Sequence, residues 1–285
     1  MKYTILVLLF ISSSLLANTK IRSTIVNIDF GDKGEEPMLF LASGQVAFYP
    51  TSTPTTQKYL LTSSKQKYIF DFTLDNKLGI IGIQKVGTSH KISSLDKSMI
   101  LSYEPYTPTL IPSIEKAIEL FSQGRRDSKQ VSQCYNRAHI WSYEWEKKYE
   151  VQTSKVWLFF TRKYIRRYRF EWWFHVAPTV LVKIGEDVKE RVMDIKYLNA
   201  PSTIKQWTNV FIRDRSNCPI IEKFSDYTNF PESSLCYIQR SNPYFYQPVD
   251  LERYEYLGEE KLLWQDSDVS EAYLEAFDIK ESELL

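Results

Sequence analysis

Apolar and polar residues alternate over much of the first ninety positions, the pattern of strands that are buried on one face. Three segments carry it: 19–30 (TKIRSTIVNIDF), 36–50 (EPMLFLASGQVAFYP) and 66–76 (QKYIFDFTLDN). The second of these predicts two short strands joined at Ser43 and Gly44, and the polar stretches 52–57 and 63–66 predict turns. No cluster of histidine, carboxylate and nucleophile occurs here, so we expect a β-rich domain without chemistry of its own.

Helical spacing begins near Ser113, which can cap a helix over 113–123 that ends at Gly124. A second helix is predicted from Cys134, because apolar residues recur on one face at Ala138, Trp141, Trp145 and Tyr149. Strand-like runs follow at 155–160, 168–184 and 190–198, and a short helix is predicted over 201–211. The second half is therefore expected to mix helices with strands.

Pro105, Pro108 and Pro112 separate these two regions. Proline blocks helix interiors and central strands, so residues 91–112 are expected to be a linker or an extended crossing segment. We place an N-terminal domain at 18–105 and a second domain at 106–285. The acidic tail that begins at Asp250 is interpreted as a solvated face.

The first 17 residues have the composition of a signal peptide. Lys2 precedes an apolar run over 5–16, and Ala17 is a suitable cleavage position. An uncleaved anchor is the alternative, but the run is short for a membrane span and contains three serines. We expect a secreted or periplasmic protein without stable membrane association. The near balance of 36 basic and 35 acidic residues gives no global field that would select nucleic acid.

Export changes how the three cysteines are interpreted, because disulfides persist in oxidising compartments. Cys218 and Cys236 lie in one irregular region that also contains Pro219 and Pro231. A disulfide between them would stabilise the fold by about 3 kcal/mol and would leave Cys134 unpaired. An odd cysteine in an exported protein is either an intermolecular bridge or a reactive thiol, so Cys134 is a candidate functional residue.

Three histidines are available to serve this thiol. Five helical residues advance by about 500°, which leaves His139 about 140° around the axis from Cys134, so we interpret His139 as a packed or capping residue. His90 lies in a polar turn and is expected to be solvated. His175 lies in a strand among aromatic and β-branched residues, where it is either a plain core histidine or the general base.

Asp194 favours the second interpretation of His175. A carboxylate among the apolar residues of the next strand is costly unless it is paired. Neighbouring strands could bring it to one ring nitrogen of His175 and leave the other nitrogen for the thiol of Cys134. Since a helix N-terminus and a neighbouring imidazolium both favour a thiolate, these residues predict a cysteine nucleophile, a histidine base and an orienting aspartate.

Three blocks of sequence around these residues resemble the protein-glutaminase family, secreted bacterial enzymes that deamidate glutamine side chains in proteins. The blocks are CYNRAH (134–139), WWFHVAPTVLV (172–182) and VMDIKYLNAPSTIKQW (192–207), in the order and approximate spacing of the family. The resemblance covers 120–215 well and 241–251 weakly. It implies an α+β fold with a papain- and transglutaminase-like catalytic core.

Residue by residue, the resemblance implies Cys134 as nucleophile, His175 as general base and acid, and Asp194 as the orienting carboxylate. It implies hydrolysis of glutamine side chains through a cysteine thioester, without a metal or cofactor. It also implies an inhibitory N-terminal pro-segment, for which 18–105 is the candidate. We expect protein or peptide substrates with an accessible glutamine, an activating protease, no nucleic acid, and a monomer.

Two features depart from the family pattern. Ile195 follows Asp194 where the family has proline, and residues 153–170 carry six Lys or Arg and no acid. We interpret that basic run as a solvated strand face, with steering of acidic protein substrates as the alternative. The triad itself does not separate a deamidase from a transglutaminase or a cysteine protease. A catalytically silent exported binding protein is the alternative from another class.

Overall fold

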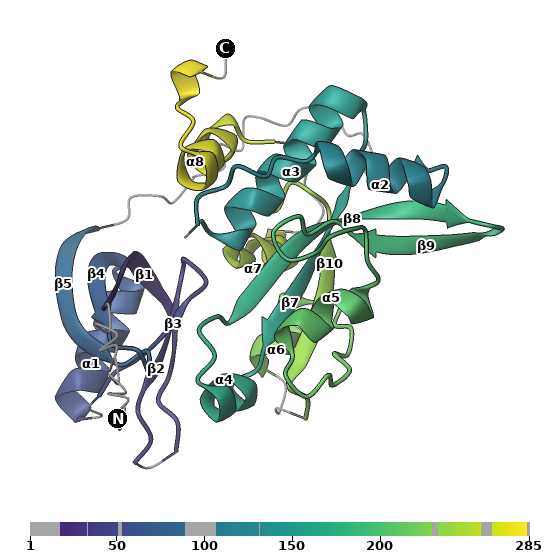
Figure 1. Cartoon of the computed structure of the whole chain (residues 1–285). Coiled ribbons are helices and arrows are strands. Elements are labelled where there is room, and N and C mark those ends of the chain that lie inside the picture. The colour runs from purple at the N-terminus through teal and green to yellow at the C-terminus, as the bar shows by residue number, and fades with distance from the viewer. Residues whose placement is uncertain are drawn as a thin grey trace, which may run out of the picture. The chain divides into compact units, whose positions relative to one another are not determined.

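The computed structural model of the chain describes residues 18–32, 34–50, 53–88, 107–130, 132–229, 233–257 and 264–283. The predicted signal peptide, most of the predicted linker and His90 lie outside these residues. The chain divides into two compact units: Met1–Leu39 with Ala47–Ser89, and Phe40–Val46 with His90–Leu285. Figure 1 labels their helices and strands.

The first unit is built on a five-stranded sheet in the order β3-β2-β1-β4-β5. Its strands are β1 (Thr19–Asp29), β2 (Met38–Leu41), β3 (Val46–Phe48), β4 (Tyr68–Leu74) and β5 (Ile80–Thr88). Alternate residues of β4 are buried, namely Phe70, Phe72 and Leu74, as the sequence pattern requires. The edge strand β5 was not predicted, because most of its side chains are exposed or half-buried and its sequence lacks a clear alternation.

In the polar stretches that were predicted to be turns, residues 54–57 and 63–65 belong instead to helix α1 (Pro54–Lys65), and Thr53 and Gln66 are its caps. The Thr53 side chain accepts a hydrogen bond from the backbone N–H of Thr56, and Pro54 occupies the first helical turn. These are helix start signals, since proline at that position lacks only an N–H that would have no partner in the helix. The same residue types also occur in turns, which explains the error.

The second unit is organised around a sheet in the order β10-β7-β8-β6, with β9 also paired to β8. Its strands are β6 (Leu110–Ile111), β7 (Ser154–Phe160), β8 (Phe174–Ile184), β9 (Asp187–Val192) and β10 (Cys236–Ser241). Its helices are α2 (Ile114–Gln123), α3 (Cys134–Tyr149), α4 (Arg162–Tyr168), α5 (Ile204–Phe211), α6 (Phe224–Asn229), α7 (Pro248–Leu257), α8 (Asp266–Phe277) and the short 3₁₀ helix η1 (Glu281–Glu283). This arrangement confirms the predicted α+β class.

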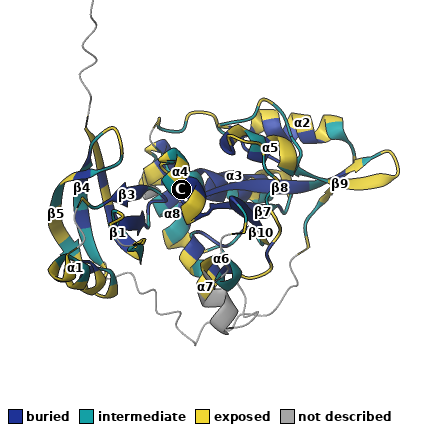
Figure 2. Cartoon of the chain, turned by 90° about the horizontal axis from the view of Figure 1, so that it is seen from below, coloured by how far each residue is buried: buried dark blue, intermediate teal, exposed yellow. Residues whose placement is uncertain are grey.

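Helices α2 and α3 pack against β8, and α8 packs against α3 (Figure 1). Figure 2 shows α3, β7 and β8 largely in the colour of buried residues. The predicted apolar stripe of α3 is buried at Ala138, Trp141 and Trp145, whereas Tyr149 at the end of the helix is exposed. The nucleophile candidate therefore begins a helix whose remaining turns are fixed in the core.

Two predictions about polar segments of this unit were wrong. The basic run is not a strand face, because after β7 it forms helix α4, whose Tyr164 and Ile165 are buried. The acidic tail is not only a solvated face either: α8 buries an apolar side that includes Val269, Ala272 and Tyr273. In both cases the charged residues concealed a short apolar stripe with helical spacing.

Gly124, which ends α2, is required by a close approach. A Cβ atom at this position would overlap the side chain of Ile195 and crowd the ring of Trp145. Ile195 is nearly buried in the core cluster that includes Trp145 and Met193. The residue that directly follows Asp194 is thus fixed in the core by the end of α2.

The segment Phe40–Val46 groups with the second unit, although the sequence assigned it to the N-terminal domain. Within that unit the backbone N–H of Val46 donates to the carbonyl of Glu171 over 2.8 Å. The carbonyl of Gly44 accepts a 3.0 Å hydrogen bond from Trp173, just before β8 begins. Gly44 has a φ of +90° and lies close to the ring of Phe174, so the turn requires glycine for both conformation and space.

Candidate active site

Cys134 is the first residue of α3 and its side chain is half-buried. The N-cap residue, Gln133, forms no side-chain hydrogen bond to the first turn. The first N–H groups of a helix have no partner within the helix, and here no cap supplies one. The thiol therefore lies at a helix end whose dipole and N–H groups favour negative charge.

His175 and Asp194, which the sequence proposed as partners, form a direct contact. Nε2 of His175 lies 2.7 Å from Oδ2 of Asp194, and both side chains are almost completely buried. The same carboxylate oxygen accepts a 2.9 Å hydrogen bond from Nε1 of Trp207 in α5. Trp207 was recognised in the sequence only as part of a motif, and its role as a second donor to Asp194 was not predicted.

The charge state of His175 is set by these neighbours. Burial would lower the pKa of His175, but the charge and hydrogen bond of Asp194, together with a hydrogen bond that His175 donates to the Cys134 side chain, raise it to about 9. Since Nε2 is engaged by Asp194, the nitrogen left for the Cys134 side chain is Nδ1. The three predicted site residues thus meet in the order thiol, imidazole, carboxylate.

Aromatic rings surround the imidazole of His175 on several sides. The ring of Trp172 stacks on it at a centroid distance of 5.8 Å, and Phe211 lies at 4.4 Å. Tyr197 meets it edge-on at 5.1 Å. Rings of this kind fix the imidazole plane and exclude water from the pair with Asp194. Trp172 in the histidine block, Tyr197 in the aspartate block and Phe211 just after it were the available sequence signal for this wall.

One detail of the prediction needs correction: Asp194 does not lie on a strand. β9 ends at Val192, and Asp194 begins a turn in which its carbonyl accepts hydrogen bonds from Tyr197 and Leu198. Because Asp194 lies beyond the end of the strand, the alternation of the sheet does not fix the direction of its side chain. The carboxylate can therefore reach His175 while Ile195 enters the core.

Arg137, one turn beyond Cys134, is a buried cation beside this site. Its Nη1 donates to the carbonyl and hydroxyl of Ser132, and its guanidinium lies 5.9 Å from the ring centre of Tyr197. Burial, with the negative charges of Asp194 and Cys134, raises the pKa of Tyr197 to about 12, which Arg137 opposes. The arginine holds the segment that leads into α3.

His139 is completely buried and is separated from the site by the turn of the helix, as the angle argument predicted. Its Nδ1 lies 3.0 Å from Nζ of Lys155 in β7. Burial, and then the charge of Lys155, lower the pKa of His139 well below its ordinary value, so it is neutral. No local sequence pattern indicated this role of Lys155, which was grouped with the basic run.

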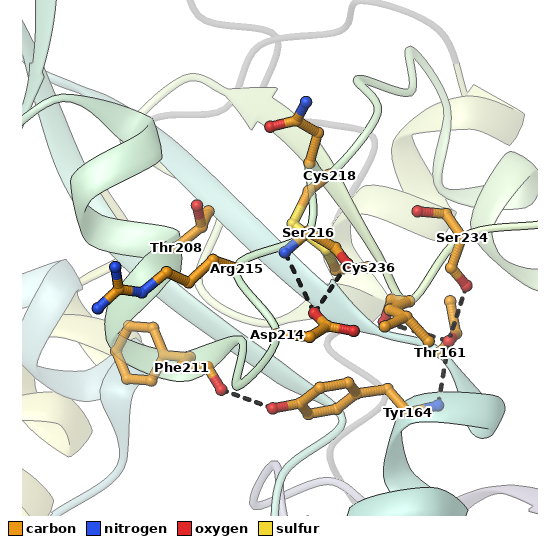
Figure 3. Close-up of a disulfide and its surroundings, with 12 residues drawn as sticks. Thr161, Tyr164, Thr208, Phe211, Asp214, Arg215, Ser216, Cys218, Ser234 and Cys236 are labelled. Carbon is orange, nitrogen blue, oxygen red and sulfur yellow. Dashed lines mark hydrogen bonds between the residues drawn. A yellow bond between two sulfur atoms is a disulfide. The ribbon is translucent and has the colours of Figure 1, made fainter.

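Cys218 and Cys236 form a disulfide, which leaves Cys134 as the free thiol among the three cysteines (Figure 3). The bridge fastens the segment after α5 to the start of β10. In the same view, the hydroxyl of Tyr164 donates to the carbonyl of Phe211 over 2.7 Å. Because Phe211 packs on His175, these contacts fix one wall of the site.

Such a constellation can perform nucleophilic acyl transfer. A thiol next to an imidazole that is oriented by a carboxylate is the arrangement that cysteine-dependent acyl-transfer enzymes use. Among the described residues, no group of three or more His, Cys, Asp or Glu side chains could hold a metal ion. No helix in the described part of the chain is long and apolar enough to span a membrane.

One segment of the chain matches a known protein family. Residues 119–211 match the model of a family described as glutaminase, and this range includes Cys134, His175 and Asp194. The resemblance to the protein-glutaminase family that the sequence predicted is thereby confirmed for these residues. None of the curated proteins matches the chain.

Solved structures of similar proteins carry related names. A crystal structure of pro-protein-glutaminase is 15% identical, and the alignment covers 89% of this chain and 98% of that one, with a TM-score of 0.49. The NMR structure of protein-glutaminase from Chryseobacterium proteolyticum is 16% identical, with coverage of 58% and 86% and a TM-score of 0.37. A crystal structure of protein-glutaminase is 16% identical over 63% and 91%, with a TM-score of 0.38.

Proposed function

We propose that the protein is a cysteine amidohydrolase that deamidates glutamine side chains of proteins to glutamate. The observation that carries the proposal is the buried pair of His175 and Asp194, with the side chain of Cys134 on the remaining imidazole nitrogen. Its position inside the segment that matches the glutaminase family supports glutamine as the substrate. Cys134 is the nucleophile, His175 the proton carrier and Asp194 the orienting acid.

The reaction begins from the thiolate of Cys134 and protonated His175, a state that the raised pKa of His175 favours. The thiolate attacks the carboxamide carbon, a C–S bond forms, and the carbonyl electrons move to oxygen. His175 donates its Nδ1 proton to the amide nitrogen, the C–N bond breaks, and ammonia leaves a thioester. Proton donation of this kind contributes about 10²–10⁴ in rate.

Hydrolysis completes the cycle. Neutral His175 takes a proton from water, the hydroxide adds to the thioester carbon, and the C–S bond breaks. Glutamate leaves, and the thiolate of Cys134 and the imidazolium are restored. The open N–H groups of the first turn of α3, including that of Cys134, are suitable donors to the oxyanion of both intermediates. Losing one such donor costs about 10²–10³ in rate.

We further propose that the catalytic core is papain- and transglutaminase-like, and that residues 18–105 are an inhibitory pro-segment. The order of nucleophile on a helix followed by histidine and aspartate on the sheet side supports the core assignment. The protein is exported, secreted or periplasmic, and a protease activates it by cutting after the N-terminal domain. The disulfide is consistent with an oxidising compartment.

Two rival activities use the same three residues. A transglutaminase would admit an amine in place of water, and a cysteine protease would accept the main-chain amide. A catalytically silent binding protein is the rival from a different class. We favour deamidation because the matched family is described as glutaminase.

The test uses the full chain, before and after limited proteolysis, with casein as substrate and the Cys134→Ser variant as control. Ammonia is assayed, and Gln-to-Glu conversion is located by peptide mass spectrometry. Conversion that is absent from the variant supports the proposal. Substrate that is cut or cross-linked while its glutamines stay intact would change the reaction assigned to the triad. No reaction at all, with an unreactive Cys134, would overturn it.

A further inference from the structure

The first turn of α3 carries the reactive thiol but lacks a side-chain cap. Its N-cap residue, Gln133, donates and accepts no capping hydrogen bond through its side chain. A cap would occupy N–H groups of this turn that the reaction can use, so its absence has a chemical advantage. The same absence removes a contact that normally prevents helix ends from fraying, and the turn must be held from outside the helix.

The loop at Phe245–Gln247 holds this turn from outside the helix, because it contacts Tyr135 and Asn136, the two residues that follow Cys134. The hydroxyl of Tyr246 donates to Oδ1 of Asn136. The ring of Tyr246 meets the ring of Tyr135 edge-on at 5.2 Å, and the Tyr135 phenol is hydrogen-bonded by Gln247. The loop is itself ordered at the start of α7, where Oδ2 of Asp250 accepts the backbone N–H groups of Tyr246 and Gln247.

A completely buried lysine fixes the same loop from the sheet. Nζ of Lys155 in β7 donates to the carbonyl of Phe245 over 2.6 Å and to Nδ1 of His139 over 3.0 Å. The imidazole of His139 in turn packs against the ring of Tyr246 at 4.8 Å. One amine thus joins the strand, the loop and the second turn of α3.

The amine is suited to this contact in its neutral form. Burial lowers the pKa of Lys155 to about 7, although the negative charges of Asp250 and Asp268 oppose the shift. A neutral amine has two N–H groups, which equals the number of acceptors that Lys155 meets. His139, the other titratable group in contact, is neutral and accepts at Nδ1. A buried lysine is costly in a core where methionine would pack, and such costs are characteristic of functional positions.

We propose that Lys155 and His139 are positioning residues for Cys134, which act by holding the loop at Phe245–Gln247 against the first turn of α3. Their contacts are with each other and with the loop. Their effect is to keep the thiol in hydrogen-bonding position to His175 while the helix end stays uncapped. The inference rests on the proposed function only in taking Cys134 as the reactive group.

The test measures the rate at which iodoacetamide alkylates Cys134 in the full chain between pH 5 and 9. Because the other cysteines are in the disulfide, Cys134 is the free thiol that is read out. In Lys155→Met and Tyr246→Phe we expect the midpoint of the pH profile to rise by about 0.5–1 pH unit, since the thiolate loses its fixed partner. At a pH below both midpoints this corresponds to alkylation about 3–10-fold slower.

Tyr273→Phe is the matched control. Tyr273 is also a buried tyrosine whose hydroxyl hydrogen-bonds to an α3 side chain, that of Glu144, but at a distance from the first turn. Tyr273→Phe should lower the melting temperature about as much as Tyr246→Phe does, and it should leave the pH profile of alkylation unchanged. His139→Leu should raise the midpoint of the pH profile as Lys155→Met does. His139→Asn retains an acceptor near Nδ1 and should therefore raise the midpoint less than His139→Leu.

Identical profiles in Tyr246→Phe, Tyr273→Phe and the unmodified chain would overturn the proposal, because a merely structural pair lowers stability without moving the midpoint. If Lys155→Met does not fold, the Tyr246 and His139 variants decide the question. The alkylation assay needs no glutamine substrate. A failed deamidase assay together with shifted profiles would therefore remove the proposed reaction and keep the positioning role.

Discussion

Two histidines on neighbouring elements of the second unit are equally buried and have opposite chemistry. His175 meets the carboxylate of Asp194, which with Cys134 raises its pKa to about 9 despite burial. His139 meets the amine of Lys155, and burial with that positive charge lowers its pKa far below the usual value. Both rings are also packed by aromatic residues. The partner, not the burial, decides which histidine can carry a proton.

The two histidines meet different partners because they lie on different elements. His175 lies in β8, opposite Leu158 of β7, where it faces the turn that carries Asp194. His139 points from α3 toward Lys155 in β7. The first is part of the proposed chemistry, and the second holds the helix on which the nucleophile lies.

The largest effect is expected from removing the negative charge beside His175. Asp194→Asn should lower the rate of ammonia release from casein by about 10³–10⁴, because the imidazole loses its orienting and charge-stabilising partner. His139→Asn should lower it by less than about tenfold. Steady-state rates of both variants check this. Equal losses would mean that the two histidines are not functionally distinct.

The opposed partners predict a pH dependence of stability. His175 contributes stability that is complete below its ordinary pKa of 6.5 and is lost as the pH rises through about 9. Lys155, whose pKa is lowered from 10.5 to about 7, has the opposite sign and gains stability above pH 7. Lys155→Met removes this second contribution. Relative to the unmodified chain, the unfolding free energy of the variant should therefore fall by about 1.4 kcal/mol per pH unit between pH 7 and 9.

Denaturant titrations followed by tryptophan fluorescence measure this difference, since all seven tryptophans belong to the second unit. The profile of the variant should slope downward relative to that of the unmodified chain over this range. Parallel profiles would contradict the lowered pKa of Lys155.

A smaller effect is expected where the turn of Asp194 meets α2. Gly124→Ala places a Cβ against Ile195, and overpacking of this kind costs about 1–3 kcal/mol. Adding Ile195→Ala should recover part of the loss, so the two changes should be non-additive in a thermal unfolding cycle. Strict additivity would show that the two residues relax independently.

The smallest effect is expected at the second donor to Asp194. Trp207→Phe removes the hydrogen bond from Nε1 while the ring is largely retained, and should lower kcat about tenfold with little change in KM. His139→Asn provides the comparison for an equally buried polar change outside the triad. A rise in KM with unchanged kcat would assign Trp207 to substrate binding instead.

Much of this architecture could be predicted from sequence. The alternation in β1 and β4, the cap of α2 at Ser113 and the start of α3 at Cys134 are local patterns with local causes. The joining of His175 with Asp194 also followed from sequence, because a carboxylate among apolar residues needs a partner.

The remainder depends on contacts between distant segments. Lys155 was counted as part of a basic run, since its acceptor at Phe245 lies ninety positions further along the chain. The acidic residues of α8 obscured its helical pattern in the sequence. Its apolar side is buried because it packs against α3, which lies far away in the chain. The turn at Asp194 depends on Ile195 filling the space beside Gly124, which no local pattern indicates.

The pairing of β10 with β7 has a consequence for how the thiols are sorted during oxidation. Three cysteines allow three possible disulfides, and two of these would consume Cys134. β10 is aligned so that Cys236 lies opposite Phe160 and Ser241 opposite Lys155. A shift by one residue would turn Cys236 to the other face of the sheet and displace the loop that Lys155 holds. The strand register that places the loop against the proposed nucleophile therefore also leaves Cys134 outside the disulfide, because it offers Cys218 a partner other than Cys134.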